Sequence, residues 1–408
     1  MIVRDKCIVC GSKNLYKALD LGVMPSANDL VGKNELKKVK SYPLAYYICT
    51  NCGLLQQINF VSRDLLFVNY PYITGVNKVL VDHFKEMSME LRKMVKHKNI
   101  AVVIGSNDGT EVNLLKAVGF KKAIGIEPSD VAEIAKKRKI PTIKAFFTYN
   151  LSIKLVKRLG KAYLITANNV FAHIPDPKDM LKGMANLIKT DGIISIEVHS
   201  LGSLIKHLEI EALYAEHYFV WSVKAMQTLS SQVGLKVHNV IFMPEQHGGS
   251  LRFIIKKGKE NFQSFSLPDD NYNISRVIHT FQKRADIRKQ KFVSLIKGIK
   301  KSGKKIGIWS VPAKIPTLIN FCGLTNKDID YAYEIANTKI GKYIPKANIK
   351  IKDEKEIPQD MPDYLIIGAW NYIDFAKKKL EWYLNKGGKL INPLNCRIYK
   401  KPQHIKGD

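Results

Sequence analysis

The 408-residue chain is long for one hydrophobic core, so two or three domains are expected. Its 46% hydrophobic and 25% charged residues are typical of a globular protein, and no apolar run approaches the ~20 residues of a membrane span. A cysteine pair stands where a signal peptide would need an apolar stretch, so we expect a cytoplasmic protein with no membrane partner.

The formal net charge of +29 is compatible with nucleic-acid binding. However, the lysines are spread over nearly every segment, as at 37–40, 136–139 and 300–305, and few aromatic residues lie among them. This distribution favours a basic, solvated surface. The alternatives are a field that recruits an anionic small molecule, or RNA binding.

Four of the six cysteines form two matched knuckles, at 7–11 and 49–53, and each ends in Cys-Gly. Two residues between thiolates let both sulfurs reach one tetrahedral ion, and the glycine permits the turn that wraps it. Disulfides conflict with a cytoplasmic location, and a redox motif needs one reactive pair rather than two. Four thiolates fill the shell of a zinc ion, which predicts a structural site. The predicted metal ligands are Cys7, Cys10, Cys49 and Cys52.

A strand–turn–helix pattern begins near residue 97. The apolar run 101–104 predicts a buried strand, and the turn 105–109 (GSNDG) leads into a helix, as in the first half of a doubly wound sheet. The turn has two glycines rather than the three of a dinucleotide fingerprint. Its Asp108 would repel a pyrophosphate but suits a cationic sulfonium and ammonium. S-adenosylmethionine is therefore favoured over a dinucleotide, although glycines in such turns are also common for geometry alone.

Polar residues follow the later strands of this predicted sheet. Glu127 lies 22 residues beyond Gly105, where it is expected to accept the ribose hydroxyls. The strand in YLITANNVFAHIPDP ends in a polar turn at the edge where ligands bind, and the strand 192–200 brings Glu197 and His199 to the same edge. The predicted cofactor-binding residues are Gly105, Asn107, Asp108, Gly109, Glu127, Asn168, Asn169 and His173.

A second α/β unit is predicted after a polar boundary near 258–272. A helical stretch leads into the strand KIGIWS, and DYAYEI, DYLIIGAW and GGKLINPL predict further strands. The turn after the first of these strands lacks a dinucleotide fingerprint, so no second redox cofactor is expected.

These motifs together resemble the sugar-nucleotide C-methyltransferases of deoxysugar biosynthesis, the type that makes branched sugars such as mycarose and tetronitrose. The resemblance runs nearly end to end. It implies an α/β protein with a zinc-binding domain (1–65), a central S-adenosylmethionine domain of the class I Rossmann-like type (66–258) and a C-terminal Rossmann-like domain that binds the sugar nucleotide (259–408). The motifs that carry it are LDLGVMPSAN (19–28), YPYITG (70–75), IGSNDGT (104–110), GIEPS (125–129), NNVFAHIPD (168–176), YAEH (214–217), HGGSLR (247–252), GKYIP (341–345) and PDYLIIGAWNY (362–372).

The resemblance also implies a mechanism and its residues. A base removes the proton on the carbon beside a ketone, and the enolate takes the methyl group. The family pattern Y-H-E-H falls on residues 214–217, which makes His217 the candidate base and Tyr214 and Glu216 its companions. An imidazole titrates near neutral pH, and an enolate oxygen needs hydrogen-bond donors. Tyr72 is the implied oxyanion donor.

The chain departs from the family pattern in four places, one of which is the segment YFVWSV (218–223) after the Y-H-E-H motif. Ala215 replaces the first histidine of Y-H-E-H, and Val103 and Ile104 replace an acidic residue before the first glycine of the cofactor loop. In the C-terminal loop, Trp309 and Ile315 replace glycines. These changes bear on the identity of the sugar and of the methylated carbon, and the expected fold and cofactor are unaffected.

Basic groups suit a diphosphate, so lysines and aromatic residues of the C-terminal domain are candidates for holding the nucleotide. The implied partner is a dTDP-, GDP- or CDP-linked sugar, and the protein is expected to be a monomer. The predicted substrate-binding residues are His199, His247, Lys314, Lys342, Tyr343, Trp370 and Asn371.

Two other functions fit part of the pattern. A zinc knuckle, a cofactor fold and a pI near 9.7 also describe RNA-modifying methyltransferases, but no N-P-P-Y motif is present and an extra Rossmann-like domain suits a nucleotide sugar better. Nucleic acid is therefore not the expected partner. A non-catalytic nucleotide-sugar-binding homologue is the second alternative, because Ala215 and Trp309 alter two family motifs.

Overall fold

The computed structural model describes residues 2–62, 73–246, 248–270 and 272–401. The chain forms two compact units. The first consists of Met1–Lys17, Tyr46–Lys206 and Glu216–Ile274, and the second of Ala18–Ala45, His207–Ala215 and Ser275–Asp408. The three sequence-based domains differ from these units in their limits and stay a prediction.

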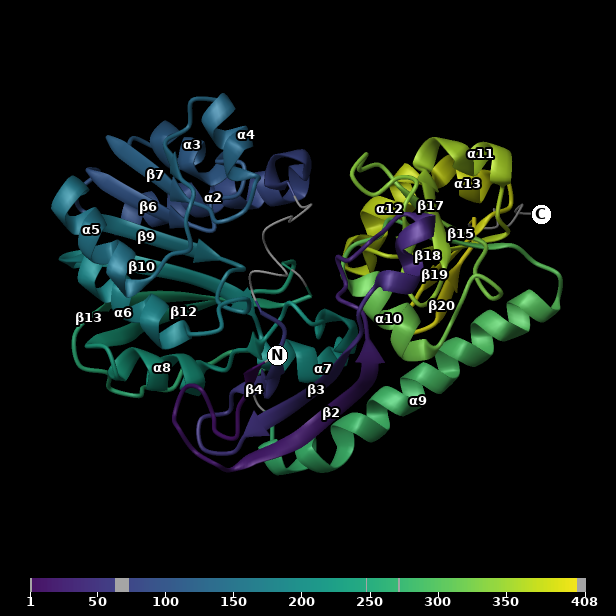
Figure 1. Ribbon diagram of the computed structural model, residues 1–408, viewed down its shortest axis with the longest axis horizontal. Coiled ribbons are helices and arrows are strands. Elements are labelled where there is room, and N and C mark those ends of the chain that lie inside the picture. Colours follow the sequence, from purple (N-terminus) through teal and green to yellow (C-terminus); the bar gives the residue numbers. More distant parts are fainter. Residues whose placement is uncertain (1, 63–72, 247, 271, 402–408) are drawn as a thin grey trace, which may run out of the picture. The chain divides into compact units, whose positions relative to one another are not determined.

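A seven-stranded sheet forms the centre of the first unit (Figure 1). Its strand order is β12-β13-β10-β9-β6-β7-β8; β8, β7, β6, β9 and β10 are parallel, and β13 is antiparallel to both neighbours. The order reverses between β6 and β9, so ligands are expected beside the carboxyl ends of these two strands. The strands are β6 (Ile100–Ile104), β7 (Lys122–Ile126), β8 (Thr142–Ile143), β9 (Ala162–Asn168), β10 (Ile188–His199), β12 (Leu235–Met243) and β13 (Ser250–Lys257).

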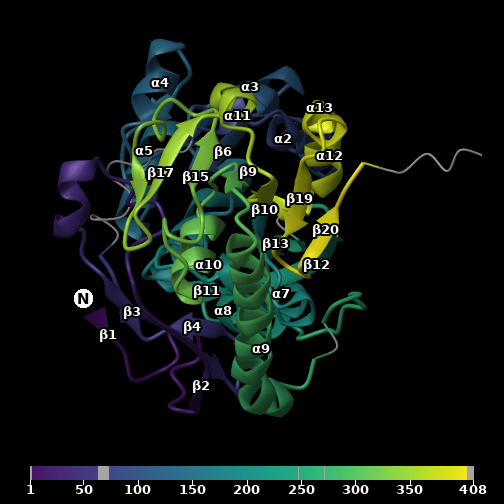
Figure 2. The ribbon, with the colours of Figure 1, turned by 90° about the vertical axis from the view of Figure 1, so that its right-hand side faces the viewer.

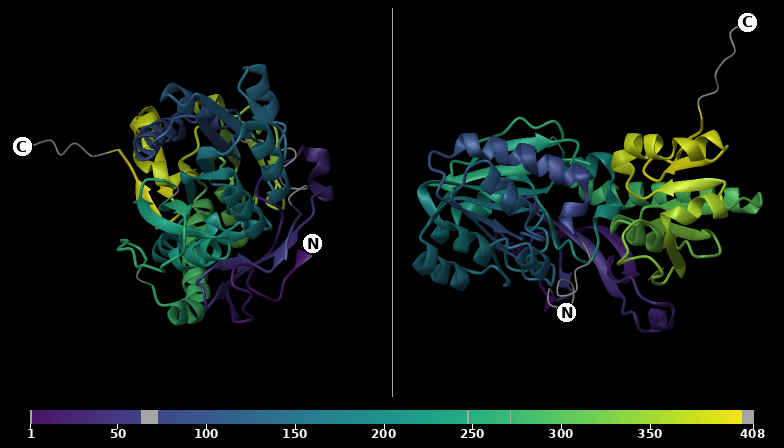
Figure 3. Two further views of the ribbon diagram at one scale, coloured as in Figure 1. Left: turned by 90° about the vertical axis from the view of Figure 1, so that its left-hand side faces the viewer. Right: turned by 90° about the horizontal axis from the view of Figure 1, so that it is seen from above.

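Helices cover both faces of this sheet (Figure 3), because successive strand residues point to opposite sides. Ala101 and Val103 of β6 share one core with α2, α3 and α4, whereas Val102 and Ile104 share the other with α5, α6 and α8. The helices are α2 (Lys78–Met94), α3 (Thr110–Ala117), α4 (Ala132–Lys137), α5 (Tyr149–Leu159), α6 (Pro177–Leu187), α7 (Leu201–His207) and α8 (Val223–Ser231).

The cysteine knuckles lie in turns next to short strands of the N-terminal region. Cys49 ends β3 (Tyr42–Cys49), which forms a hairpin with β4 (Leu55–Gln57), and β4 pairs with β11 (Phe219–Val220). Cys7, Cys49 and Cys52 are part of the same apolar core as α6 and α8. The remaining N-terminal strands are β1 (Ile2–Val3), β2 (Leu15–Met24) and β5 (Asn59–Phe60).

The second unit contains another seven-stranded sheet, whose strands are seen in Figure 2. Its order is β16-β17-β15-β14-β18-β19-β20, with the five inner strands parallel and both edge strands antiparallel. This is a Rossmann-like order with its reversal between β14 and β18. The strands are β14 (Ile306–Trp309), β15 (Tyr331–Glu334), β16 (Tyr343–Ile344), β17 (Ile349–Asp353), β18 (Tyr364–Ile367), β19 (Lys389–Asn392) and β20 (Arg397–Tyr399).

The longest helix of the second unit is amphipathic. In α9 (Ile274–Lys301) the buried residues recur every three or four positions, which gives one apolar stripe, and the other faces are largely basic. The other helices of this unit are α10 (Lys314–Cys322), α11 (Ile357–Asp360), α12 (Ile373–Lys379), α13 (Glu381–Asn385) and the short 3-10 helices η1 (Lys33–Lys38), η3 (Ile210–Ala212), η4 (Glu354–Glu356) and η5 (Trp370–Tyr372).

The architecture confirms the expected fold class, with two Rossmann-like sheets and a small cysteine-bearing module. Within the described ranges, no helix has both the length and the apolar character that crossing a membrane requires.

Candidate functional site

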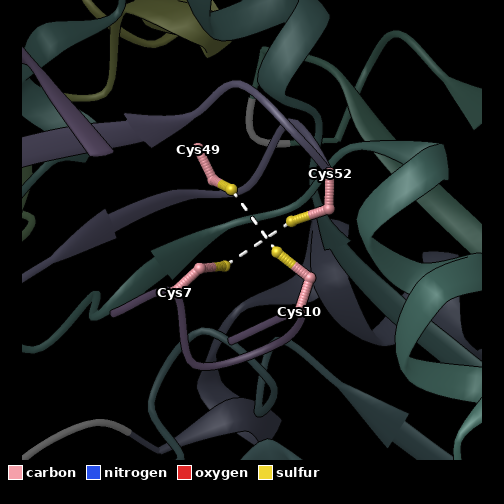
Figure 4. Close-up of side chains that lie close together, drawn as sticks. All are labelled: Cys7, Cys10, Cys49 and Cys52. Carbon is pink, nitrogen blue, oxygen red and sulfur yellow. Dashed lines mark hydrogen bonds between the residues drawn. The ribbon is translucent and has the colours of Figure 1, made fainter. Parts of the chain in front are cut away.

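The four knuckle cysteines converge on one point (Figure 4). Their sulfur atoms all lie within 4.8 Å of one another, and the Cys7–Cys52 and Cys10–Cys49 pairs are 3.5 Å apart. All four are free thiols. The thiol contact between Cys49 and Cys52 lowers the pKa of Cys49 and raises that of Cys52. Without a metal, ionisation of one of these thiols therefore opposes ionisation of the other. A bound dication relieves this conflict, and a tetrahedral zinc ion fits four such donors.

Both knuckles have the same backbone geometry. The Cys7 N–H donates to the carbonyl of Ser12 at 2.8 Å, and the Gly11 N–H donates to the Cys7 carbonyl at 2.9 Å. In the second knuckle the Gly53 N–H donates to the Cys49 carbonyl at 2.8 Å. Gly11 and Gly53 have φ of 72° and 74°, a conformation that favours glycine. The ring of donors is therefore closed, which suits a structural ion.

The two glycines of the predicted cofactor loop are required by packing. Gly105 follows β6 with φ of 70°, and a Cβ there would lie 2.4 Å from the side chain of Val170, in the loop after β9. Gly109 is the N-cap of α3 with φ of 83°, and a Cβ there would lie 2.8 Å from Ile140. The loops after β6 and β9 thus lie against each other at the reversal of strand order.

Asp108 is fully buried in this loop, and four protein donors engage it, one of which is the Thr110 N–H at 3.3 Å. Its carboxylate accepts hydrogen bonds from Arg138 (2.9 Å), the Thr110 hydroxyl (2.7 Å) and the Gly75 N–H (3.2 Å). The Asp108 carboxylate was expected to attract the sulfonium of the cofactor, and the ion pair with Arg138 offsets its negative charge. Asn107, beside it, has a left-handed φ of 51°. The roles of both residues toward a cofactor stay predictions.

Glu127 follows β7 directly and is 6% exposed. Its carboxylate accepts hydrogen bonds from the Asn107 N–H (2.9 Å), the Ser129 N–H (2.9 Å) and the Ser129 hydroxyl (2.6 Å). A carboxylate has about four lone-pair sites, so Glu127 retains capacity for one further donor. This pattern is compatible with its predicted contact to a ribose.

Asn168 ends β9 with its amide orientation fixed by Glu111. The Asn168 Nδ2 donates to Glu111 at 2.9 Å, and the Thr166 hydroxyl donates to the other Glu111 oxygen at 2.5 Å. Burial raises the pKa of Glu111 to about 7. Among the described residues the Asn168 Oδ1 is a buried acceptor with no hydrogen-bond donor. A buried acceptor at this edge fits a ligand that carries an amino or ammonium group.

The last residues of β10 lie beside Asn168, because Glu197 is its register partner. Glu197 is fully buried and binds His83 (2.9 Å) and Arg252 (3.2 Å). It therefore belongs to an internal ion-pair network. His199, two residues on, is buried at the carboxyl end of the strand, where it was predicted.

Two imidazoles lie together beyond the carboxyl end of β9. The ring centres of His173 and His217 are 4.7 Å apart, with the ring planes inclined by 48°. The His173 Nδ1 donates to the Glu216 carbonyl at 2.7 Å, and the Tyr218 N–H donates to the Ala172 carbonyl at 2.7 Å. The segment 216–218 is thereby attached to the loop 169–176. Desolvation lowers the pKa of His173 to about 4, so this ring is neutral near pH 7.

The predicted substrate residues of the second unit fall into two groups. Lys314 begins α10, after β14, and its Nζ lies 5.1 Å from the ring centre of Trp370. η5, which contains Trp370 and Asn371, begins three residues beyond β18, so these residues and Lys314 border the strand reversal. Lys342 and Tyr343 lie instead at the edge strand β16, outside this pair.

Trp309 and Ile315, which replace family glycines, fill this part of the second unit. Both are buried, Trp309 in the apolar core beside β18 and Ile315 in the first turn of α10. Gly368 follows β18, where a Cβ would lie 2.0 Å from the Ser310 carbonyl. The loop is thus closely packed around apolar side chains.

Tyr72 and His247 lie outside the described residues. Tyr214 is half-buried and follows η3 by two residues.

Sequence reasoning missed Tyr46, Gln57 and Glu111. The side chains of Tyr46 and Gln57 donate to the carbonyl oxygen of His217, at 2.6 and 2.8 Å. No motif marks them, and only the alternation of buried residues along a short strand could have suggested that they point inward.

Comparisons with known proteins agree with this geometry. Three families match successive segments: a zinc binding domain at residues 7–67, a methyltransferase domain at 95–240 and a C-methyltransferase C-terminal domain at 245–395. The C-methyltransferase NovU of Streptomyces niveus is 26% identical over 408 residues, which covers 96% of this chain and 95% of NovU.

Solved structures resemble only part of the chain. Magnesium protoporphyrin IX methyltransferase from Synechocystis PCC 6803 covers 44% of this chain and 78% of its own, at 10% identity and a TM-score of 0.32. The CcbJ methyltransferase from Streptomyces caelestis covers 43% and 90%, at 8% identity and a TM-score of 0.35. Likeness at this level supports no functional argument.

Proposed function

We propose that the substrate of this S-adenosylmethionine-dependent methyltransferase is a nucleotide-linked keto-deoxysugar. The methyl group would go to the carbon next to the ketone. The observation that carries this proposal is the fixed pair of imidazoles, His173 and His217, beside the strand reversal of the first unit.

His217 is the proposed base that removes the proton from the substrate carbon. Its neighbour His173 must donate through Nδ1, because a carbonyl oxygen only accepts, so the neutral ring presents a lone pair on Nε2. The low pKa of His173 keeps this ring uncharged at neutral pH. A proton taken up by His217 therefore meets no second positive charge 4.7 Å away.

S-adenosylmethionine, when bound, supplies an electrophilic methyl group to the enolate carbon. The residues proposed to hold it are those of the loops after β6, β7 and β9, with Glu127 and Asn168 as hydrogen-bond acceptors. Glu216 and Tyr214 are proposed as companions of His217 in binding the keto group. The four-cysteine zinc ion has a structural role, because a closed set of four thiolates leaves no position for a substrate.

We assign the nucleotide to the second unit. Its strand reversal lies between β14 and β18, and Lys314 and Trp370 meet beside it. A lysine next to an indole offers a positive charge for a diphosphate and an aromatic face for a base. His199, Lys342, Tyr343 and Asn371 stay further substrate-binding predictions.

The direct test is mass spectrometry of incubations with S-adenosylmethionine and dTDP-, GDP- and CDP-linked 4-keto-6-deoxysugars. We expect one of these nucleotide sugars to gain a single CH2. A deuterium label on the carbon beside the ketone should be lost in the same reaction. Transfer of a labelled methyl group to tRNA or rRNA, with none to any sugar, would instead support the RNA-modifying alternative. No transfer to either would support a binding protein.

A further inference from the structure

Two buried side chains of the β3–β4 hairpin converge on one backbone oxygen. The Tyr46 hydroxyl donates to the His217 carbonyl at 2.6 Å, and the Gln57 Nε2 donates to the same oxygen at 2.8 Å. The Gln57 Nε2 also lies 2.9 Å from the Tyr46 hydroxyl, to which it donates. Tyr46 and Gln57 are register partners across the hairpin, and their exposed fractions are 0% and 2%.

The backbone around His217 is held from two directions. The Gln57 N–H donates to the Tyr218 carbonyl at 2.9 Å, so the hairpin binds two successive carbonyls. On the other side, His173 and Ala172 bind the Glu216 carbonyl and the Tyr218 N–H. The Cα from which the His217 side chain projects is therefore fixed by bonds on both sides.

Tyr46 and Gln57 bond to each other within the hairpin, and both also donate to the His217 carbonyl outside it. A buried hydroxyl and amide cost free energy unless they are hydrogen-bonded, and apolar residues are the usual occupants of such positions. Desolvation raises the pKa of Tyr46, which keeps its hydroxyl protonated as a donor. The adjacent Gln56 differs, because its side chain accepts from the Ile8 N–H at 3.1 Å and so supports the first knuckle.

We propose that Tyr46 and Gln57 are positioning residues for His217, and that the zinc-bound hairpin thereby sets the place of the base. This inference rests on the proposed function, in which His217 removes the substrate proton. Proton transfer from carbon depends on the placement of the base, and a shift of ~1 Å can cost ~100-fold in rate. The cysteine module would then contribute to catalysis through backbone geometry rather than through contact with the substrate.

The shared acceptor makes the effects of the two residues non-additive. Tyr46→Phe leaves the Gln57 bond in place, and Gln57→Leu leaves the Tyr46 bond, so each alone is expected to lower kcat by only ~3-fold. The double variant loses both and is expected to lower kcat by ~30-fold or more, above the ~9-fold product of the single effects. The KM for the sugar and the Kd for S-adenosylmethionine are expected to stay within ~2-fold, because no substrate contact is removed.

Two neighbours provide matched controls. Tyr47→Phe removes the same hydroxyl from the next strand position, which points to the opposite side of the hairpin, and is expected to leave kcat unchanged. Gln56→Leu removes the same amide from the adjacent position, on the side of the first knuckle. It is expected to weaken zinc retention and thermal stability without lowering kcat in the zinc-replete protein.

A second readout does not require turnover. The carbon-13 ring signal of His217 is assigned by its disappearance in His217→Asn, and we expect it to shift in the double variant and not in Tyr47→Phe. If the double variant does not fold, the His217 ring signal is compared between each single variant and Tyr47→Phe. An unchanged His217 signal, or unchanged kcat, in a folded double variant with full zinc content would overturn the positioning role. Failure of the wild-type protein to methylate any sugar would overturn only the proposed function, and the ring signal would still decide this inference.

Discussion

The imidazole of His173 is bonded through Nδ1 to the carbonyl oxygen of Glu216, the residue that precedes His217. One hydrogen bond thus fixes the tautomer of the first ring and the backbone next to the second. The two rings come from segments more than 40 residues apart, and they meet because the loop after β9 and the segment before β11 pair their backbone groups.

Replacement of His217 by Asn should abolish most of the turnover. We expect kcat to fall by ~100-fold to ~10,000-fold, the range typical of a lost general base. The Kd for S-adenosylmethionine, measured by calorimetry, should be unchanged. His238→Asn, an exposed histidine of β12, is the matched control and should keep wild-type kcat. Wild-type turnover of His217→Asn would remove this residue from the mechanism.

The buried state of His173 should make folding stability depend on pH. Its pKa is lowered from 6.5 to about 4 by desolvation, so between these values the unfolded chain binds a proton that the folded chain does not. Its contribution to stability is therefore complete above about pH 6.5 and is lost as the pH falls toward 4. Urea titrations of wild type and His173→Asn should show a smaller loss for the variant over this window. Parallel curves for the two proteins would contradict the assignment.

Glu111 should control cofactor affinity through Asn168. In Glu111→Gln the new amide can present a donor to the Asn168 Nδ2, which would favour an amide flip and turn the buried acceptor Oδ1 away from the ligand edge. We expect the Kd for S-adenosylmethionine to rise by ~10-fold. The exposed Glu86→Gln of α2 is the control. Unchanged affinity in Glu111→Gln would show that the Asn168 acceptor does not contact the cofactor.

Removal of zinc should unfold the hairpin and reduce activity together. One zinc ion per chain is expected by elemental analysis, and Cys49→Ser should lose it along with a large part of the thermal stability. Cys396→Ser, a partly exposed thiol outside the cluster, should keep the full metal content. A Cys49→Ser protein with wild-type zinc content and melting temperature would exclude the four-thiolate site.

The cofactor loop should tolerate no side chain at Gly105. Gly105 and Gly234 have nearly equal φ, 70° and 71°, but a Cβ would meet Val170 at 2.4 Å in the first case and nothing within 4 Å in the second. Both alanine variants should lose about 1 kcal/mol from backbone strain. Only Gly105→Ala should also weaken cofactor binding, by ~10-fold or more. Equal Kd values for the two variants would show that the contact between the loops does not affect the site.

The sequence was sufficient for the features that depend on local pattern. The Cys-x-x-Cys-Gly knuckles, the strand and turn at Gly105, and the core strands of both sheets follow from spacing and apolar periodicity. Lys314 and Trp370 were separate substrate-binding candidates, and their proximity was not predicted from the sequence.

Features that depend on register could not be obtained in this way. Asp108 was assigned to a cationic ligand from its charge, because nothing in the sequence shows that Arg138, 30 residues away, binds it. Glu111 looks like an acidic residue at the start of a helix, and its contact with Asn168 depends on how β6 and β9 are placed side by side. Tyr46 and Gln57 acquire their role only when the hairpin meets a segment 160 positions or more along the chain.

The chain passes from one compact unit to the other five times, after residues 17, 45, 206, 215 and 274. No single cleavage can release either complete unit. A gene fragment that encodes residues 275–408 would lack 18–45 and 207–215, which belong to the same unit. Limited proteolysis should therefore nick this protein without separating its pieces. For the same reason the C-terminal Rossmann-like portion is a poor candidate for transfer, as a free-standing cassette, into another enzyme.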